Sequence, residues 1–222
     1  MAKKPQPASN VIRFPVEAVS RAGFKRSHVL TEEKSSLMEA EGQMNLFRGD
    51  GAADRAGARM GTVVPIPLQM GAFESAILLD DNEDPRAEDA YRRAIAEGDF
   101  VPDAWCNLGV LKSIKRDLDA AFECFAQSLA ADPRHAESHY NIGNLYFEFG
   151  DLKLARMHYE KAIECDGELA SAYFNLGLVT ALAEDYQKAY DSLAHYKCIA
   201  PPEEIGVADD LMRYLKSAIN LS

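Results

Sequence analysis

Three six-residue stretches decide the fold: AWCNLG at residues 104–109, SHYNIG at 138–143 and AYFNLG at 172–177. Each stretch begins 34 residues after the one before it, with no insertion between them. Two further sets of positions keep the same interval in the second half of each unit: Ala121, Ala155 and Ala189, and then Phe125, Tyr159 and Leu193. A period of 34 residues with small and large residues at fixed positions is typical of a helical pair that repeats along a solenoid.

Small residues in each unit predict close contact between its two helices. Gly109, Gly143 and Gly177 have no side chain, so a second helix can approach them closely. Each glycine inside a helix costs about 1 kcal/mol relative to alanine. We expect the repeated alanines 12 residues further on to face these glycines. One unit cannot bury its apolar face alone, so neighbouring units are expected to stack.

The repeat has an atypical unit at one end and a single helix at the other. From about Gly71 a degenerate first unit begins, and its second helix at residues 85–97 keeps the 34-residue register. Its first helix carries Glu74 and Ser75 where the other units have an aliphatic residue and Gly. After Pro202, apolar residues at near-helical spacing predict a capping helix over residues 203–220.

These recurring positions resemble the tetratricopeptide repeat (TPR) family over about half of the chain. The resemblance implies an all-α fold, a TPR helix-turn-helix solenoid with three full repeats, one degenerate first repeat and a C-terminal capping helix. It also implies a non-enzymatic protein–protein interaction adaptor or scaffold, in which the first helix of each unit lines a concave groove that takes a peptide or a helix. The array at residues 71–222 would then follow a tail at residues 1–70.

The predicted peptide-binding residues come from the first helix of each unit. Asn107, Asn141 and Asn175 share one position, and they resemble the asparagine ladder by which TPR proteins hold an extended main chain. An asparagine amide offers both donors and an acceptor, so it can bind a peptide group whatever the side chain beside it. The alternative is that these asparagines bridge neighbouring helices of the array. Further candidates for the groove are Tyr140, Asn144, Phe147, Phe174 and Leu178.

Charge is divided unevenly along the chain. Residues 1–71 carry 10 Lys and Arg against 7 Asp and Glu, whereas residues 72–222 carry 14 against 28. An acidic array disfavours direct binding to nucleic acid, whose phosphates require basic contacts. The balance favours a neutral or basic polypeptide partner, although a solvated acidic surface would have the same composition. The sequence leaves the oligomeric state open.

The tail at residues 1–70 is predicted to be flexible, with a short helix near residues 31–41. Within it, Gln43-Met44-Asn45-Leu46-Phe47 resembles the pentapeptide by which bacterial replication and repair proteins hold the sliding clamp. This possible linear motif, Gln43, Met44, Leu46 and Phe47, suggests an alternative function as a regulatory subunit for replication or transcription, unless the cluster is incidental. Residues 63–68 form either a rigid spacer or a plug that folds back into the groove.

Several function classes lack support in the sequence. No apolar run is long enough to cross a bilayer and no signal peptide is recognisable, which predicts a cytoplasmic protein without membrane contact. No phosphate-binding loop, nucleophile motif or metal-ligating pattern is recognisable, so we predict no enzyme activity, no cofactor and no metal site. The acidic run at residues 80–84 is expected to be a solvated turn. The four cysteines are expected to be buried reduced thiols, Cys106, Cys124, Cys165 and Cys198.

Overall fold

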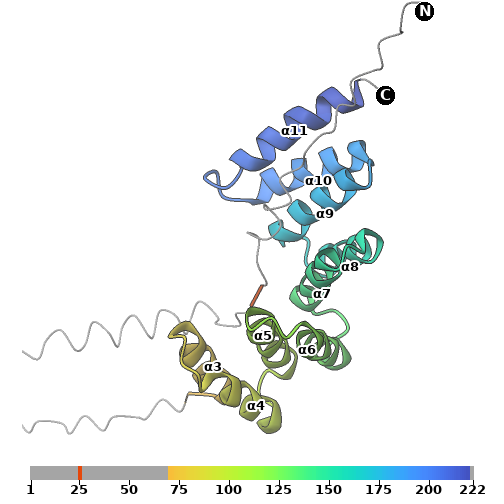
Figure 1. The fold of residues 1–222 in the computed structure, drawn as a ribbon. Coiled ribbons are helices and arrows are strands. Elements are labelled where there is room, and N and C mark those ends of the chain that lie inside the picture. The colour runs from red at the N-terminus through yellow and green to blue at the C-terminus, as the bar shows by residue number, and fades with distance from the viewer. Residues whose placement is uncertain (1–24, 27–69, 221–222) are drawn as a thin grey trace, which may run out of the picture.

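The computed structural model describes residues 25–26 and 70–220, and these residues form nine α-helices without a strand (Figure 1). The first four helices are α3 (Ala72–Asp81), α4 (Ala87–Glu97), α5 (Val101–Ile114) and α6 (Leu118–Ala131). The remaining helices are α7 (Ala136–Glu148), α8 (Leu152–Cys165), α9 (Ala170–Leu182), α10 (Tyr186–Ile199) and α11 (Gly206–Ile219). The all-α fold class predicted from the 34-residue period is therefore confirmed.

The helices pack as consecutive pairs, α3 with α4, α5 with α6, α7 with α8 and α9 with α10, and α11 packs last against α10. Figure 1 shows that the pairs follow one another along a curved array, with the Lys25–Arg26 segment beside α5 on the inner side of the curve. The α3–α4 pair is the degenerate first repeat, and the next three pairs are the full repeats.

Aspartates at the starts of the second helices repeat with the same period. The carboxylates of Asp117, Asp151 and Asp185 accept hydrogen bonds from the backbone N–H groups three residues further on. Such a cap satisfies one of the helix's unpaired N-terminal donors and is worth about 1 kcal/mol. Each of the three full repeats therefore begins its second helix with the same local interaction, whereas α4 of the first unit has Arg86 at this position and no side-chain cap.

The glycines that recur every 34 residues lie where the two helices of a unit approach each other closely. A Cβ atom on Gly109 would lie 2.6 Å from Phe125 Cε1, and one on Gly143 would lie 2.6 Å from Tyr159 Cε1. The nearest neighbour is thus an aromatic ring, not the alanine that the spacing suggested. At the third unit the neighbour is Leu193, 2.8 Å from the equivalent position on Gly177.

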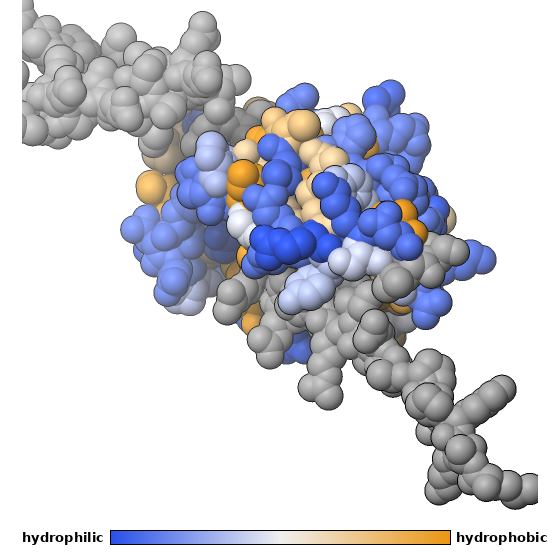
Figure 2. All heavy atoms as spheres, turned by 90° about the horizontal axis from the view of Figure 1, so that it is seen from above, coloured by the Kyte–Doolittle hydropathy of each residue, from blue (hydrophilic) through white to orange (hydrophobic). Residues whose placement is uncertain are grey.

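The capping helix covers the apolar end of the array. Ala208, Leu211 and Leu215 of α11 are buried in one cluster with side chains of α9 and α10. Viewed from above, the described surface is mostly hydrophilic, with apolar side chains exposed only in small areas (Figure 2). Within residues 70–220, none of the helices is both long enough and apolar enough to span a membrane.

The structure corrects two expectations about single residues. Cys106 and Cys124 are buried free thiols as expected, but Cys165 is only half-buried and Cys198 is exposed. The acidic run at residues 80–84 is not uniformly solvated, because Asp80 is 3% exposed. The reason is that Asp80 lies on the same face of α3 as the buried Phe73 and Ile77.

Candidate functional site

The inner side of the array holds one residue of the N-terminal segment by its main chain. The backbone N–H of Lys25 donates to Asn141 Oδ1 at 2.8 Å, and Asn141 Nδ2 donates to the Lys25 carbonyl at 2.7 Å. Both polar groups of one residue's main chain are thereby paired by one amide side chain. The Lys25 side chain takes no part in these two hydrogen bonds, so they do not depend on which residue stands at this position.

Cys106 completes the contact with Lys25. Its Sγ lies 3.8 Å from the Lys25 carbonyl oxygen and 3.4 Å from Asn141 Nδ2. Burial raises the pKa of the Cys106 thiol to about 12, so it stays protonated near neutral pH and can donate a weak hydrogen bond. The Cys106 side chain is therefore a packing and hydrogen-bonding group, not a nucleophile.

The next residue of the segment places its side chain on the first unit. Arg26 Nη2 lies 2.7 Å from Asp80 Oδ1, and the Tyr91 hydroxyl donates to Asp80 Oδ2 at 3.0 Å. The Asp80 side chain is only 2% exposed, so its charge needs such partners. Burial and the neighbouring Asp80 carboxylate raise the pKa of Tyr91 far above its usual value, so the hydroxyl keeps its proton as a donor.

We call these contact residues the inner-face site: Asp80, Tyr91, Cys106 and Asn141. Of the four, only Asn141 was predicted as a binding residue. Asp80 could have been found from the sequence, because it continues the apolar face of its helix seven residues after Phe73. No pattern in the sequence singled out Lys25 or Arg26 as the segment that binds.

Asn175 is bound into the interface between the last two units. Its Nδ2 donates to Asn144 Oδ1 at 2.9 Å and lies 3.2 Å from the Tyr140 hydroxyl. The Tyr159 hydroxyl donates to the same Asn144 oxygen at 2.8 Å. The Asn175 Oδ1 atom is buried and has no partner among the described residues. Asn175 therefore bridges helices, with one acceptor left over.

The residue 16 positions before each repeated asparagine is one of its possible hydrogen-bond partners. These residues are Tyr91 for Asn107, Phe125 for Asn141 and Tyr159 for Asn175. Tyr91 interacts with Asn107 by a side-chain hydrogen bond, and Tyr159 Oη lies 3.5 Å from Asn175 Nδ2. Phe125 has no hydroxyl to offer Asn141. The Asn141 amide can therefore direct its donors and acceptor to the Lys25 main chain.

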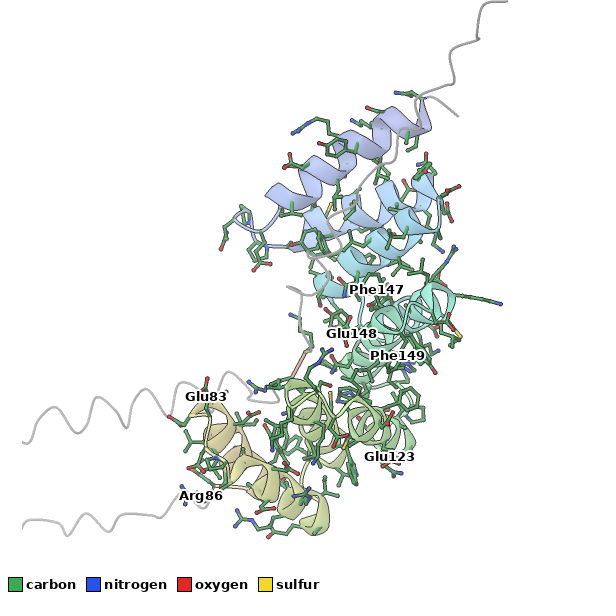
Figure 3. All side chains as sticks on the ribbon, in the orientation of Figure 1. Glu83, Arg86, Glu123, Phe147, Glu148 and Phe149 are labelled. Atoms are coloured by element: carbon green, nitrogen blue, oxygen red, sulfur yellow. The ribbon has the colours of Figure 1, made fainter. Side chains whose placement is uncertain are left out.

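The other predicted groove residues lie mainly in the core. Tyr140 is 0% exposed, Leu178 is 2% exposed and Phe174 is 8% exposed. The Phe174 ring packs 5.1 Å from that of Tyr196, centroid to centroid, in the cluster that α11 covers. Phe147 is half-buried near the end of α7 (Figure 3). Their role in peptide binding stays a prediction, and their visible role is to join neighbouring units.

Some predicted features fall outside the described residues. They are the linear motif of Gln43, Met44, Leu46 and Phe47, the short helix at residues 31–41 and the possible plug at residues 63–68. In the part of the chain that the structure describes, no three metal-ligating side chains gather into a group that could hold a metal ion.

Comparison with known proteins agrees with the geometry of the helical pairs. The family described as Tetratricopeptide repeat matches residues 100–168. A BBSome complex member BBS4 homolog from Drosophila melanogaster is 26% identical over 54% of this chain and 25% of its own length. Neutrophil cytosol factor 2 from Bos taurus is 33% identical over 39% of this chain and 16% of its own length. Tetratricopeptide repeat protein 8 from Mus musculus is 28% identical over 51% of this chain and 22% of its own length.

The chain thus spans a quarter or less of the length of these relatives. Among solved structures, the first TPR of Spaghetti (RPAP3) bound to the HSP90 peptide SRMEEVD matches with a TM-score of 0.49. That match has 16% identity and covers 54% of this chain and 93% of that chain.

Proposed function

Since this chain belongs to the tetratricopeptide repeat family, we propose that it is a non-enzymatic cytoplasmic adaptor that binds a neutral or basic peptide on the inner side of its array. The observation that carries the proposal is the double hydrogen bond between Asn141 and the Lys25 main chain. A polypeptide partner would present the same N–H and C=O groups. An extended peptide is therefore the ligand class that this amide suits best.

The burial of the site supports a peptide partner over solvent. Asn141 is 0% exposed, so its amide needs hydrogen-bond partners on whatever covers it. Each main-chain hydrogen bond contributes about 1 kcal/mol net, and both would be lost if the amide were removed. The expected loss on truncating this side chain is therefore about tenfold in affinity or more.

Charge supports a neutral or basic partner over an acidic one. Residues 72–222 carry 28 Asp and Glu against 14 Lys and Arg, and the one side chain seen on the inner-face site from outside the array is an arginine. An acidic peptide would therefore be repelled by the net charge of the array.

A peptide-selection experiment tests the proposal. A library of random 12-residue peptides is selected on the full chain, and the enriched peptides are then measured with Asn141→Ala and with Gln127→Ala, an exposed amide on α6. We expect neutral or basic peptides whose affinity falls about tenfold with Asn141→Ala and is unchanged with Gln127→Ala. Enrichment of acidic peptides, or equal binding to both variants, would show that the proposal is wrong.

The alternative function, recruitment to replication or transcription through Gln43–Phe47, stays a prediction. It is tested by capture of a bacterial sliding clamp on the full chain and on a chain carrying Phe47→Ala. Capture that depends on Phe47 would support a regulatory subunit, and absence of capture would remove this alternative.

A further inference from the structure

We propose that Asp80 and Tyr91 form an arginine-binding subsite on the inner side of the array, and that the chain's own Arg26 occupies it until a partner displaces it. This inference rests on the proposed peptide-binding function and deepens it, because it names the side chain that the partner must carry. A ligand would be recognised as an extended segment in which an arginine follows the residue held by Asn141.

The contacts of the own-chain segment reach three repeat units. Lys25 touches Asn141 on α7 and Cys106 on α5, and Arg26 touches Asp80 on α3. Lys25 is held by its main chain, which any residue could offer, whereas Arg26 is held by its side chain. Together the two contacts fix where a peptide lies on the array and which residue it must carry next.

The subsite favours arginine for physical reasons. Its carboxylate is 2% exposed, and one oxygen is already paired with the Tyr91 hydroxyl. A buried carboxylate that loses its cation is strongly unfavourable, so any segment that replaces Arg26 must bring a positive charge of its own. A guanidinium is more weakly hydrated than an ammonium and has five donors in a planar fork, so it loses less than lysine on entering this site.

Arg26 does not satisfy all of its own hydrogen-bond donors in the subsite, so a better-matched arginine could displace it. Its Nε is buried without a hydrogen-bond partner among the described residues. An unpaired buried donor weakens the bound state. A partner that pairs all the donors of its guanidinium would therefore bind more tightly than the chain's own segment.

The competition is intramolecular, so it can be strong. Residues 27–69 join Arg26 to the first described residue of the array. A tethered segment competes at an effective concentration that depends on the length and stiffness of the residues that join it to the array. A partner peptide must therefore displace the tethered Lys25–Arg26 segment, and this competition reduces the apparent affinity of the peptide for the full chain.

The proposal is tested by measuring the affinity of a labelled peptide for the full-length protein by fluorescence anisotropy. The peptide has the sequence of residues 20–31 of this chain. The peptide is titrated with the unmodified chain, with Arg26→Ala, and with Arg21→Ala as a control for loss of another tail arginine. We expect at least tenfold tighter binding to Arg26→Ala than to the other two chains. A peptide in which lysine replaces the residue copied from Arg26 should bind the Arg26→Ala chain at least fivefold more weakly.

The outcomes separate the subsite from the peptide-binding function. Equal affinities for the unmodified chain and Arg26→Ala would contradict self-occupancy, and equal binding of the arginine and lysine peptides would contradict the arginine subsite. The arginine and lysine peptides are both measured on the same Arg26→Ala chain, so misfolding of that chain cannot explain a difference between them. Binding of the arginine peptide that is unaffected by Asn141→Ala would instead contradict the main-chain contact of the proposed function.

Analytical ultracentrifugation of the unmodified chain and of Arg26→Ala shows whether the segment on the subsite comes from the same chain or from a second copy. A monomer in both cases supports occupation by the chain's own segment. A dimer that Arg26→Ala dissociates would show that the segment comes from a second copy, which would overturn the intramolecular part of the proposal.

Discussion

At the scale of single residues, Asn107, Asn141 and Asn175 share one position in successive units but have different partners. Asn141 holds the Lys25 main chain, whereas Asn175 is hydrogen-bonded to Asn144 of the preceding unit. Several neighbours differ between the two units: Phe125 stands where Asn175 has Tyr159, and Val110 stands where Asn175 has Asn144. The three asparagines are therefore not bound alike within this chain, and their role in binding a partner peptide stays a prediction.

Adding a hydroxyl at Phe125 should weaken the inner-face site. The Phe125 ring sits against Gly109 as the Tyr159 ring sits against Gly143, with Cε1 at 2.6 Å from the built Cβ in both. The new hydroxyl of Phe125→Tyr should therefore reach Asn141, as Tyr159 reaches Asn175. In an Arg26→Ala chain we expect Phe125→Tyr to reduce affinity for the residue 20–31 peptide about fivefold, roughly one hydrogen bond.

The matched control for this change is Phe149→Tyr, because the Phe149 side chain is 58% exposed at the end of α7. It should leave peptide affinity unchanged. If Phe125→Tyr also leaves affinity unchanged while the melting temperature is preserved, the hydroxyl does not govern the Asn141 amide.

His158 should make stability depend on pH. Burial, and then the nearby His139, lower the pKa of His158 from its usual 6.5 to about 4. Between these values the unfolded chain binds more protons than the folded chain, so the free energy of unfolding falls as pH falls from 6.5 toward 4. We expect a loss of about 1 kcal/mol between pH 7 and pH 5, after allowing for solvent screening of a half-buried group.

Urea denaturation at pH 7 and pH 5 measures this loss, and His158→Gln should reduce it. The Glu88 carboxylate, whose pKa is lowered to about 2 chiefly by Lys112 and Lys115, contributes only below about pH 4.5 and does not enter this window. An identical difference between the two pH values in both chains would rule out His158 as the source.

At the scale of helices, a large side chain packs on a glycine in each of the three full repeats: Phe125 on Gly109, Tyr159 on Gly143 and Leu193 on Gly177. The contact explains why glycine recurs inside the first helix of these repeats despite its low helix propensity. Any side chain there would meet Phe125, Tyr159 or Leu193 within 3 Å. The capping aspartates at the start of each second helix act locally, whereas the glycine contact sets the distance between helices.

Gly143→Ala should therefore destabilise the array although alanine favours helix. The new Cβ would lie 2.6 Å from Tyr159 Cε1, and overpacking of this kind costs about 1–3 kcal/mol. We expect a lower urea midpoint with an unchanged dependence on urea concentration. Gly206→Ala is the control, because nothing lies within 4 Å of its built Cβ at the start of α11; it should be neutral or stabilising.

At the scale of the whole molecule, each unit is stabilised mainly by its neighbours, and α11 closes the last interface. Leu215 is 0% exposed and lies in the cluster that joins α9, α10 and α11. Stability in such an array is approximately a sum over units and their contacts. Damage at one end should therefore stay near that end.

Leu215→Ala should raise amide hydrogen exchange in α9, α10 and α11 and leave α3 and α4 almost unchanged. Removing a buried leucine costs about 2–5 kcal/mol, and nearest-neighbour coupling confines the effect. Hydrogen exchange measured by mass spectrometry reads each helix separately. Tyr214→Ala, at a 62% exposed position on the same helix, is the control and should change little; equal loss of protection in α3 would contradict a modular array.

The sequence by itself determined the fold, because the 34-residue period records contacts that every unit repeats. Glycine, alanine and ring positions are each dictated by helices adjacent along the chain, so local periodicity reveals them. It also singled out Asn141 as a candidate, since an amide in a repeated first-helix position belongs to that pattern, but its role in binding a partner stays a prediction. The boundary of the predicted tail and the linear motif at Gln43–Phe47 remain predictions.

Only the tertiary structure shows that the Lys25 main chain lies on Asn141. Arg26 meets Asp80 across 54 positions of sequence, and Lys25 meets Asn141 across 116. Contacts of this kind occur once and follow no period, so no repeat in the sequence signals them. They depend on the curvature that brings α3, α5 and α7 around one short segment, and curvature arises only when all the units are stacked.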